Sequence, residues 1–240
     1  KGGSASGGQI SSTSISYDDI IVAIKQDTKG KLSIGYTMEF YPEEGKYHYT
    51  GHRNCKVVQS PAETAKNGTT CPVCGRNLTV GVEHRVQELS GIQSARMRDP
   101  AAAGNSEFRI QNDENGVRWI ADSKEKRPRY VSLVPLLEII AEALASTTSS
   151  QRVKDLYDQL TKSLGTEVAV LLRTPISDIE RRAGTHVAEG IKKVRERNIV
   201  VIPGYDGVYG VVKIWNQGDE QLTATGQEVK EEKNSQLGLF

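Results

Sequence analysis

The sequence predicts an α+β protein, in which a small cysteine-bearing module with short strands is followed by a helical domain and a C-terminal β-hairpin. Three observations support this fold class. All three cysteines of the 240-residue chain lie between 55 and 74, apolar residues recur at three-to-four spacing between 131 and 197, and a glycine-rich turn divides two apolar runs at 198–215. With 37% hydrophobic residues and a net charge of +1, the composition is that of a globular chain.

The first part of the chain predicts one helix and two strands before the cysteines. The segment 15–26 (ISYDDIIVAIKQ) is predicted to be a short helix with Ser16 as its N-cap. The segment 32–52 is predicted to form two strands joined by the turn PEEG. After the cysteines, LTVGV at 78–82 leads into a predicted short helix at HRVQEL.

The second part begins with charged and polar sequence and then becomes helical. The polar stretch contains turn signals, but its five apolar residues between 108 and 120 predict a small hairpin. Three helices are predicted beyond it, at 131–145, 152–164 and 176–197. Two strands around the turn PGYDGVYG are predicted at 198–215.

These elements and the composition divide the chain into five stretches. No run of about 18 apolar residues occurs, which argues against a membrane span. No secretory signal is visible either, so we expect a cytoplasmic location with reduced cysteines. The absent initiator Met and the Gly/Ser-rich opening suggest a fragment or a processed chain. The predicted organisation is a flexible N-terminal segment (1–14), the cysteine module (15–90), a loop-rich insertion (91–130), the helical domain with its hairpin (131–215) and a disordered tail (216–240).

The cysteines occur in two short motifs with metal-ligand spacing. CPVCG at 71–75 places Cys71 and Cys74 in a C-x2-C turn, which lets two thiolates face one ion. HRNC repeats the two-residue gap, with His52 where a first cysteine would stand before Cys55. Two such knuckles predict a zinc-ribbon module of Cys3His type. Three unrelated buried thiols are the alternative.

The fourth zinc ligand is predicted to be His52, with His48 and His84 as alternatives. His48 alternates with two tyrosines on a predicted strand, and His84 begins the following predicted helix. A catalytic zinc keeps an open coordination position, whereas four protein ligands close the tetrahedron. The zinc is therefore predicted to be structural.

Four blocks of the sequence resemble successive blocks of the endonuclease Q family of DNA-repair nucleases, whose homologues are often labelled helicase-related. The blocks are EFYPEEGKYHYTGHRNC, CPVCGRNLTVGVEHRVQEL, SLVPLLEIIAEAL and VIPGYDGVYGVVKI. In that family a PHP-type metallohydrolase domain cuts the DNA strand beside a deaminated base. The zinc module and the helical part help to hold the DNA and the damaged nucleotide. The resemblance covers 15–90 and 128–215, and it implies that the three cysteines bind zinc and that DNA is the partner.

One departure from the family concerns catalysis. A PHP centre needs clustered His, Asp and Glu and typically begins with an H-x-H pair, but none of the four histidines here belongs to such a pair. No catalytic centre is visible, so we expect the catalytic domain to lie outside this chain. The motif G-x4-GK[ST] is absent as well, so the sequence shows no helicase or ATPase motor.

Cationic and aromatic residues predict where DNA is held. Arginines surround the cysteine module, cations follow one face of the helix predicted at 176–197, and tyrosines flank the glycine-rich turn. A solvated helix face balanced by glutamates is the alternative for the cations, and an ordinary hairpin turn with D-G at its apex and its tyrosines packed on a neighbour is the alternative for the turn. The predicted DNA-contacting residues are Arg53, Arg76, Arg85, Lys192, Arg195, Tyr205 and Tyr209.

Three functions are compatible with these observations. The first is the DNA-engaging portion of a base-lesion endonuclease, inert without its metallohydrolase domain. The second is a stand-alone zinc-ribbon module that binds nucleic acid or a protein. The third is a structural zinc domain that supports docking or oligomerisation.

Overall fold

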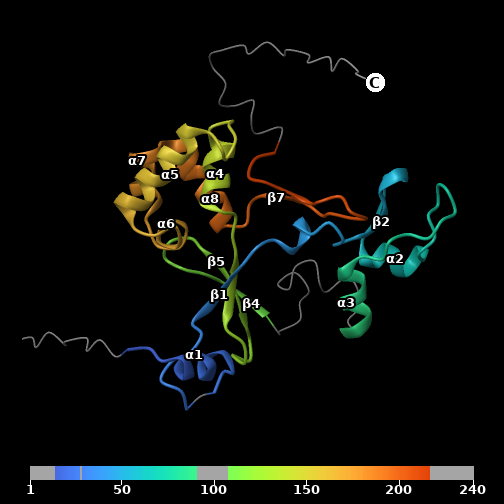
Figure 1. Cartoon of the computed structure of the whole chain (residues 1–240), viewed down its shortest axis with the longest axis horizontal. Helices are drawn as coiled ribbons and strands as arrows, with labels where there is room; N and C mark the ends of the chain where they lie inside the picture. The colour runs from blue at the N-terminus through green and yellow to red at the C-terminus, as the bar shows by residue number, and fades with distance from the viewer. Residues whose placement is uncertain (1–13, 28, 91–107, 217–240) are drawn as a thin grey trace, which may run out of the picture.

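The computed structural model describes residues 14–27, 29–90 and 108–216 of the chain. The predicted flexible N-terminal segment and disordered tail fall almost entirely outside these ranges. The described residues form an α+β fold, as predicted, with a helical part, a small sheet and a separate cysteine-bearing part (Figure 1). No helix in these ranges is both long enough and apolar enough to cross a bilayer.

Along the chain, short helices and strands are mixed up to β6, the helices α4 to α8 follow, and the strands β7 and β8 come last. The α-helices are α1 (Tyr17–Ile24), α2 (Pro61–Asn67), α3 (Val82–Ser90), α4 (Leu136–Ala143), α5 (Gln151–Leu164), α6 (Glu167–Leu172), α7 (Ile176–Ala183) and α8 (Thr185–Arg195). Two 3-10 helices are η1 (Pro42–Glu44) and η2 (Arg53–Cys55). The strands are β1 (Tyr36–Glu39), β2 (Thr50–His52), β3 (Val57–Gln59), β4 (Phe108–Asn112), β5 (Arg118–Asp122), β6 (Arg129–Ser132), β7 (Val200–Ile202) and β8 (Val211–Lys213).

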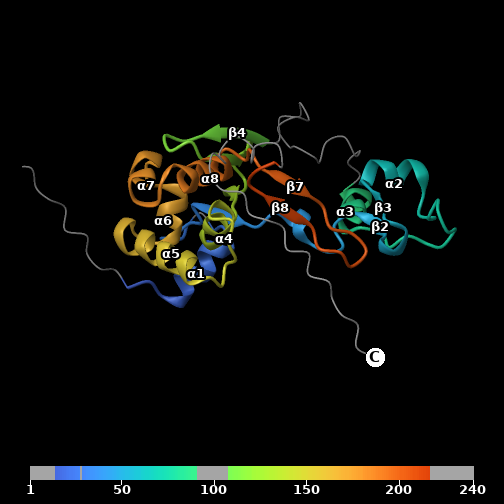
Figure 2. The ribbon, with the colours of Figure 1, turned by 90° about the horizontal axis from the view of Figure 1, so that it is seen from above.

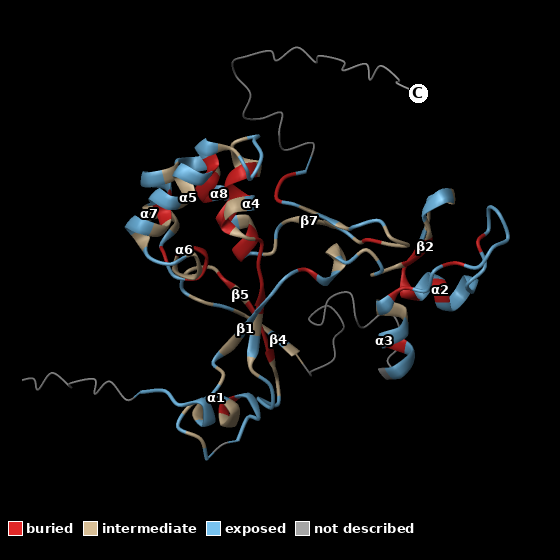
Figure 3. Cartoon of the chain, viewed as in Figure 1, coloured by how far each residue is buried: buried red, intermediate tan, exposed pale blue. Residues whose placement is uncertain are grey.

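Helices α4 to α8 pack their apolar stripes against one another and form most of the core, which lies inside the helical part in Figure 3. The predicted helix at 176–197 is in fact two helices, because Gly184 adopts φ 86° and separates α7 from α8. Helix α6 was not predicted from the sequence. Among the fully buried side chains are Leu136, Ile139, Ile140, Val153, Leu160, Ile179 and Ile191.

The four-stranded sheet has the order β1-β6-β5-β4. The hairpin predicted in the polar insertion is confirmed, because β4 and β5 pair antiparallel. It belongs to the core, since Val117 and Trp119 are buried with the helical residues. The segment 32–52 contains two strands, β1 and β2, as predicted, but the PEEG segment between them does not pair them with each other. Strand β1 instead pairs in parallel with β6, and Pro42–Glu44 forms η1, because the partner of β1 lies far along the chain.

The hairpin β7–β8 connects the helical part to the cysteine-bearing part (Figures 1 and 2). Its outgoing end is fixed to α4, because the N–H groups of Ile214 and Trp215 donate to the Glu142 carboxylate at 2.8 and 3.2 Å. The Trp215 ring stacks on His186 of α8, with ring centroids 4.3 Å apart. These contacts fix the end of the hairpin away from its tip to α4 and α8.

Candidate metal centre and nucleic-acid interface

The two predicted knuckles are present, and each is closed by short antiparallel pairing. The first turn, η2, lies between β2 and β3, where His52 pairs with Val57. The second spans 71–74, and a bridge between Thr70 and Asn77 closes it. In each knuckle the residue after the last cysteine adopts the left-handed conformation: Lys56 has φ 53° and Gly75 has φ 72°. The two turns thus bring the side chains of His52 and Cys55 close to those of Cys71 and Cys74.

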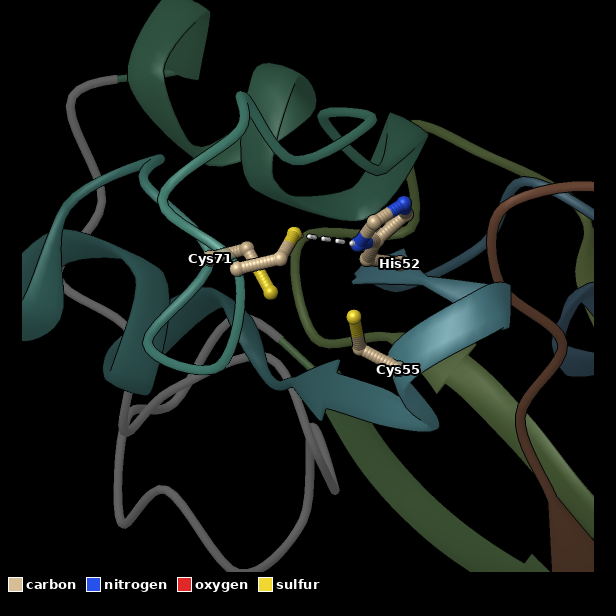
Figure 4. A group of neighbouring side chains, drawn as sticks. His52, Cys55 and Cys71 are labelled. Atoms are coloured by element: carbon tan, nitrogen blue, oxygen red, sulfur yellow. Dashed lines mark hydrogen bonds between the residues drawn. The ribbon is translucent and has the colours of Figure 1, made fainter.

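Four potential ligand atoms meet between the knuckles (Figure 4). The imidazole of His52 and the thiols of Cys55, Cys71 and Cys74 lie with these atoms within 4.8 Å of one another. The Nδ1 atom of His52 is 3.4 Å from the sulfur of Cys74. Three sulfurs and one imidazole nitrogen at this spacing can hold a metal ion in four-coordination.

The electrostatics of the cluster differ between its thiols. Burial, together with hydrogen bonds to the other two cysteines, raises the pKa of Cys55 to about 11. Burial also acts to raise the pKa of Cys71, but hydrogen bonds from the Cys74 backbone, the His52 ring and the Val73 backbone outweigh it and lower that pKa to about 6. Donors already directed at the Cys71 sulfur are the arrangement that favours a thiolate.

The two alternative histidines lie outside the cluster and have other partners. His48 has its Nε2 atom 3.2 Å from a carboxylate oxygen of Glu83. His84 has its Nε2 atom 3.5 Å from a carboxylate oxygen of Glu88. The structure therefore brings His52 to the cysteines, as predicted.

The tip of the β7–β8 hairpin is docked on the first knuckle. The carboxylate of Asp206 accepts hydrogen bonds from the Arg53 N–H at 2.7 Å and from the hydroxyl of Thr79 at 2.5 Å. Burial acts to raise the pKa of Asp206, but these bonds outweigh it and hold that pKa below its usual value. Tyr205 lies against Gly51, where a Cβ atom would come within 2.5 Å of the ring. The sequence alternative of a hairpin turn whose tyrosines pack on a neighbour describes Tyr205, but the contacts of Asp206 with Arg53 and Thr79 were not predicted.

The predicted DNA-contacting residues separate into exposed and enclosed groups. Arg53 and Arg76 are exposed beside the knuckles. Arg85 is also exposed but is paired with Glu88 at 2.9 Å. Lys192 is exposed on α8, with its Nζ atom 3.9 Å from a carboxylate oxygen of Glu196. Tyr209 is 69% exposed, whereas Tyr205 is half-buried against Gly51.

Arg195 requires a correction, because it is buried instead of sharing the exposed face of Lys192. Its side chain is 1% exposed, and burial lowers its pKa to about 10, so it stays protonated at neutral pH. The guanidinium reaches the end of α6, a helix that the sequence did not predict. It donates to four backbone carbonyls, those of Leu171 (2.8 Å), Val170 (2.9 Å), Thr174 (2.6 Å) and Asn115 (3.0 Å).

Fold and cluster together define a two-knuckle Cys3His module docked, through a β-hairpin, on a helical domain. Two solved structures share this fold. The lesion-specific endonuclease PfuEndoQ of Pyrococcus furiosus superimposes with a TM-score of 0.62 and 27% identity, over 89% of this chain and 45% of that one. A complex of endonuclease Q with a 27-mer duplex substrate carrying an abasic lesion at the active site superimposes with a TM-score of 0.60 and 28% identity. The match covers 88% of this chain and 45% of that one. The resemblance to endonuclease Q predicted from the sequence is confirmed.

Sequence comparisons agree with the structural ones. Residues 135–198 match the family described as the MJ0043 C-terminal domain. The chain is 27% identical over 196 residues to the MJ0043 protein of Methanocaldococcus jannaschii, covering 82% of this chain and 21% of that protein. It is 26% identical over 201 residues to the YqxK protein of Bacillus subtilis, covering 83% of this chain and 40% of that protein. The chain thus spans less than half the length of each of these relatives.

Proposed function

We propose that this chain is the DNA-engaging portion of an endonuclease Q-like repair nuclease that acts at deaminated bases. Incision then depends on a PHP-type metallohydrolase domain elsewhere in the full-length protein. The observation that carries the proposal is the TM-score of 0.60 to an endonuclease Q bound to duplex DNA. The fit extends over 88% of this chain, so it includes more than the helical domain alone.

The metal in this proposal is a structural zinc. Thiolates are soft ligands that suit zinc, and three of them with one imidazole leave no open position for a substrate water. The ion would join the knuckle that contains His52 and Cys55 to the knuckle that contains Cys71 and Cys74. Its chemical contribution is to crosslink the module, so that the surface carrying Arg53 and the docked hairpin keeps one shape.

Phosphate contacts come, in this proposal, from the exposed cations Arg53, Arg76, Arg85 and Lys192. Such contacts position a duplex without reading its sequence. Arg195 has no part in them, because it is buried and four of its five N–H donors bond to backbone carbonyls inside the protein.

The test is a fluorescence-anisotropy titration of the zinc-loaded 240-residue chain with duplex, single-stranded and uracil-containing DNA at increasing salt. If about four phosphates are neutralised, the slope of log K against log [salt] is expected near −3 to −4 for duplex DNA. Absence of binding to all three at low salt would overturn the proposal and leave the zinc module as a docking element. Specific incision by this chain alone, abolished by EDTA, would overturn the assignment of catalysis to another domain.

A further inference from the structure

Two exposed tyrosines share one ammonium group at the junction of the hairpin tip with the cysteine module. Tyr209 of the hairpin is 69% exposed, and Tyr47 of the segment before β2 is 46% exposed. The Nζ atom of Lys46 lies 5.5 Å from the centroid of the Tyr209 ring and 5.6 Å from that of Tyr47. Both distances are within the range of cation–π attraction.

A fourth side chain approaches the same place. A Cβ atom placed on Gly207 would be 3.3 Å from an Nη atom of Arg53 and 3.9 Å from the hydroxyl of Tyr47. The guanidinium of Arg53 and the ring of Tyr47 therefore flank the same turn. We call Lys46, Tyr47, Arg53 and Tyr209 the tyrosine–cation patch.

Backbone hydrogen bonds hold the patch together before any ligand arrives. The N–H of Gly207 donates to the carbonyl of Lys46 at 2.8 Å, and the N–H of Gly210 donates to the carbonyl of Glu44 at 3.0 Å. On the other side, the N–H of Tyr49 donates to the carbonyl of Gly204 at 2.8 Å. Segments 44–49 and 204–210 are thus fixed to each other, and a ligand would not have to order them.

The aromatic rings and cations of the patch favour an unpaired nucleotide over an intact duplex. Exposed aromatic rings offer flat faces to an unstacked base, and adjacent cations suit its phosphates. The carboxylate of Asp206 at the tip keeps its negative charge, and its oxygens are engaged by the main-chain N–H of Arg53 and the hydroxyl of Thr79. The two cations Lys46 and Arg53 outnumber that single charge. An intact duplex hides its base faces and would use only the cations.

We propose that the tyrosine–cation patch receives an unpaired nucleotide, whose base stacks on Tyr209 or Tyr47 while Lys46 and Arg53 contact the flanking phosphates. The proposal rests on the proposed function, since it assumes that the chain engages DNA. It goes further, because it assigns single-stranded or locally unpaired DNA to a defined surface. Tyr205 is not part of this surface, because its ring packs on Gly51.

The test uses the zinc-loaded 240-residue chain and a single-stranded oligonucleotide that carries 2-aminopurine, with a matched duplex. The variants are Tyr209→Ala, Tyr47→Ala, their combination, and the corresponding Phe variants. Tyr17→Ala is the matched control, because Tyr17 is 75% exposed on α1, away from the patch. Zinc content and thermal unfolding establish that each variant is folded.

The double Ala variant is expected to bind single-stranded DNA about tenfold more weakly and to lose 2-aminopurine quenching, because base–aromatic stacking is removed. The Phe variants should retain both signals, and the duplex affinity should change less than about twofold. If the double Ala variant binds single-stranded DNA like the Tyr17→Ala control, the patch assignment is wrong. Salt-dependent duplex binding would then still support the proposed function. If the wild-type chain binds no DNA at all, the proposed function itself fails.

Discussion

Asp206, at the tip of the β7–β8 hairpin, accepts a hydrogen bond at 2.7 Å from the N–H of Arg53, the residue directly after the metal-ligand candidate His52. The same carboxylate accepts a hydrogen bond from the hydroxyl of Thr79. The hairpin base is fixed on the helical domain through Glu142. Asp206 therefore couples the knuckle to the rest of the protein.

Replacing Asp206 by Asn is expected to lower the free energy of unfolding by about 1 to 2 kcal/mol, because the amide keeps one acceptor and loses the charge-assisted bond. Asn tolerates the left-handed backbone that Asp206 adopts at φ 42°, so strain does not obscure the result. Urea unfolding at constant zinc measures the change. Asp178→Asn is the control, since its partner Arg181 is exposed and the pair contributes little. Equal stability of the two variants would contradict the coupling.

Metal analysis is expected to give one zinc per chain, with three sulfur ligands and one nitrogen ligand by X-ray absorption. Cys71→Ala and His52→Ala should each lose metal and much of the thermal stability of the module, since metal binding is coupled to folding. His84→Ala should retain the zinc, because His84 pairs with Glu88 outside the cluster. Loss of zinc from His84→Ala but not from His52→Ala would show that the ligand assignment is wrong.

Arg195→Met is expected to destabilise the helical domain by about 3 kcal/mol, because it leaves buried carbonyls without a donor while nearly conserving volume. Lys192→Met, one turn earlier on α8 and exposed, should change the unfolding free energy by less than about 0.5 kcal/mol. Thermal or urea unfolding compares the two variants. Comparable effects at both positions would indicate that Arg195 is not a structural residue.

Lys192→Glu and Arg76→Glu are expected to weaken binding to all DNA sequences to a similar extent. Each should flatten the salt dependence by about one unit of slope, because each removes one phosphate contact. Unfolding curves should be unchanged, since both side chains are exposed. Salt titrations of matched duplexes with and without uracil measure the effect. A loss confined to one sequence would argue for base reading instead of phosphate contact.

The local parts of this structure were predictable from sequence, and the distant contacts were not. The C-x2-C and H-x2-C spacings fix which side chains can face one ion within a tight turn, so the sequence predicted the three cysteines and favoured His52 over His48 and His84. Ser16 was equally local, and it caps α1 as predicted by accepting a hydrogen bond from the Asp19 N–H.

Strand β1 gave no sign that its partner was β6, since parallel pairing leaves no turn in the sequence. Arg195 was misassigned for a similar reason. A cation in the last turn of a helix is usually solvated or interacts with its own helix terminus. Here it caps the end of α6, whose short segment showed too little periodicity to be recognised.

The contact between Arg53 and Asp206 also has a consequence for the order of assembly, because it joins positions 153 residues apart. The two knuckles, by contrast, are close neighbours in sequence, so closing the loop between them costs little conformational entropy once an ion is available. We expect the metal module and the helical domain to fold separately and the hairpin tip to dock last. Pulse-labelled hydrogen exchange during refolding would then show protection of the Arg53 and Gly207 amides after that of α4 and α8. Withholding zinc should leave the protection of α4 and α8 unchanged and delay both the formation of the metal module and the docking of the hairpin tip.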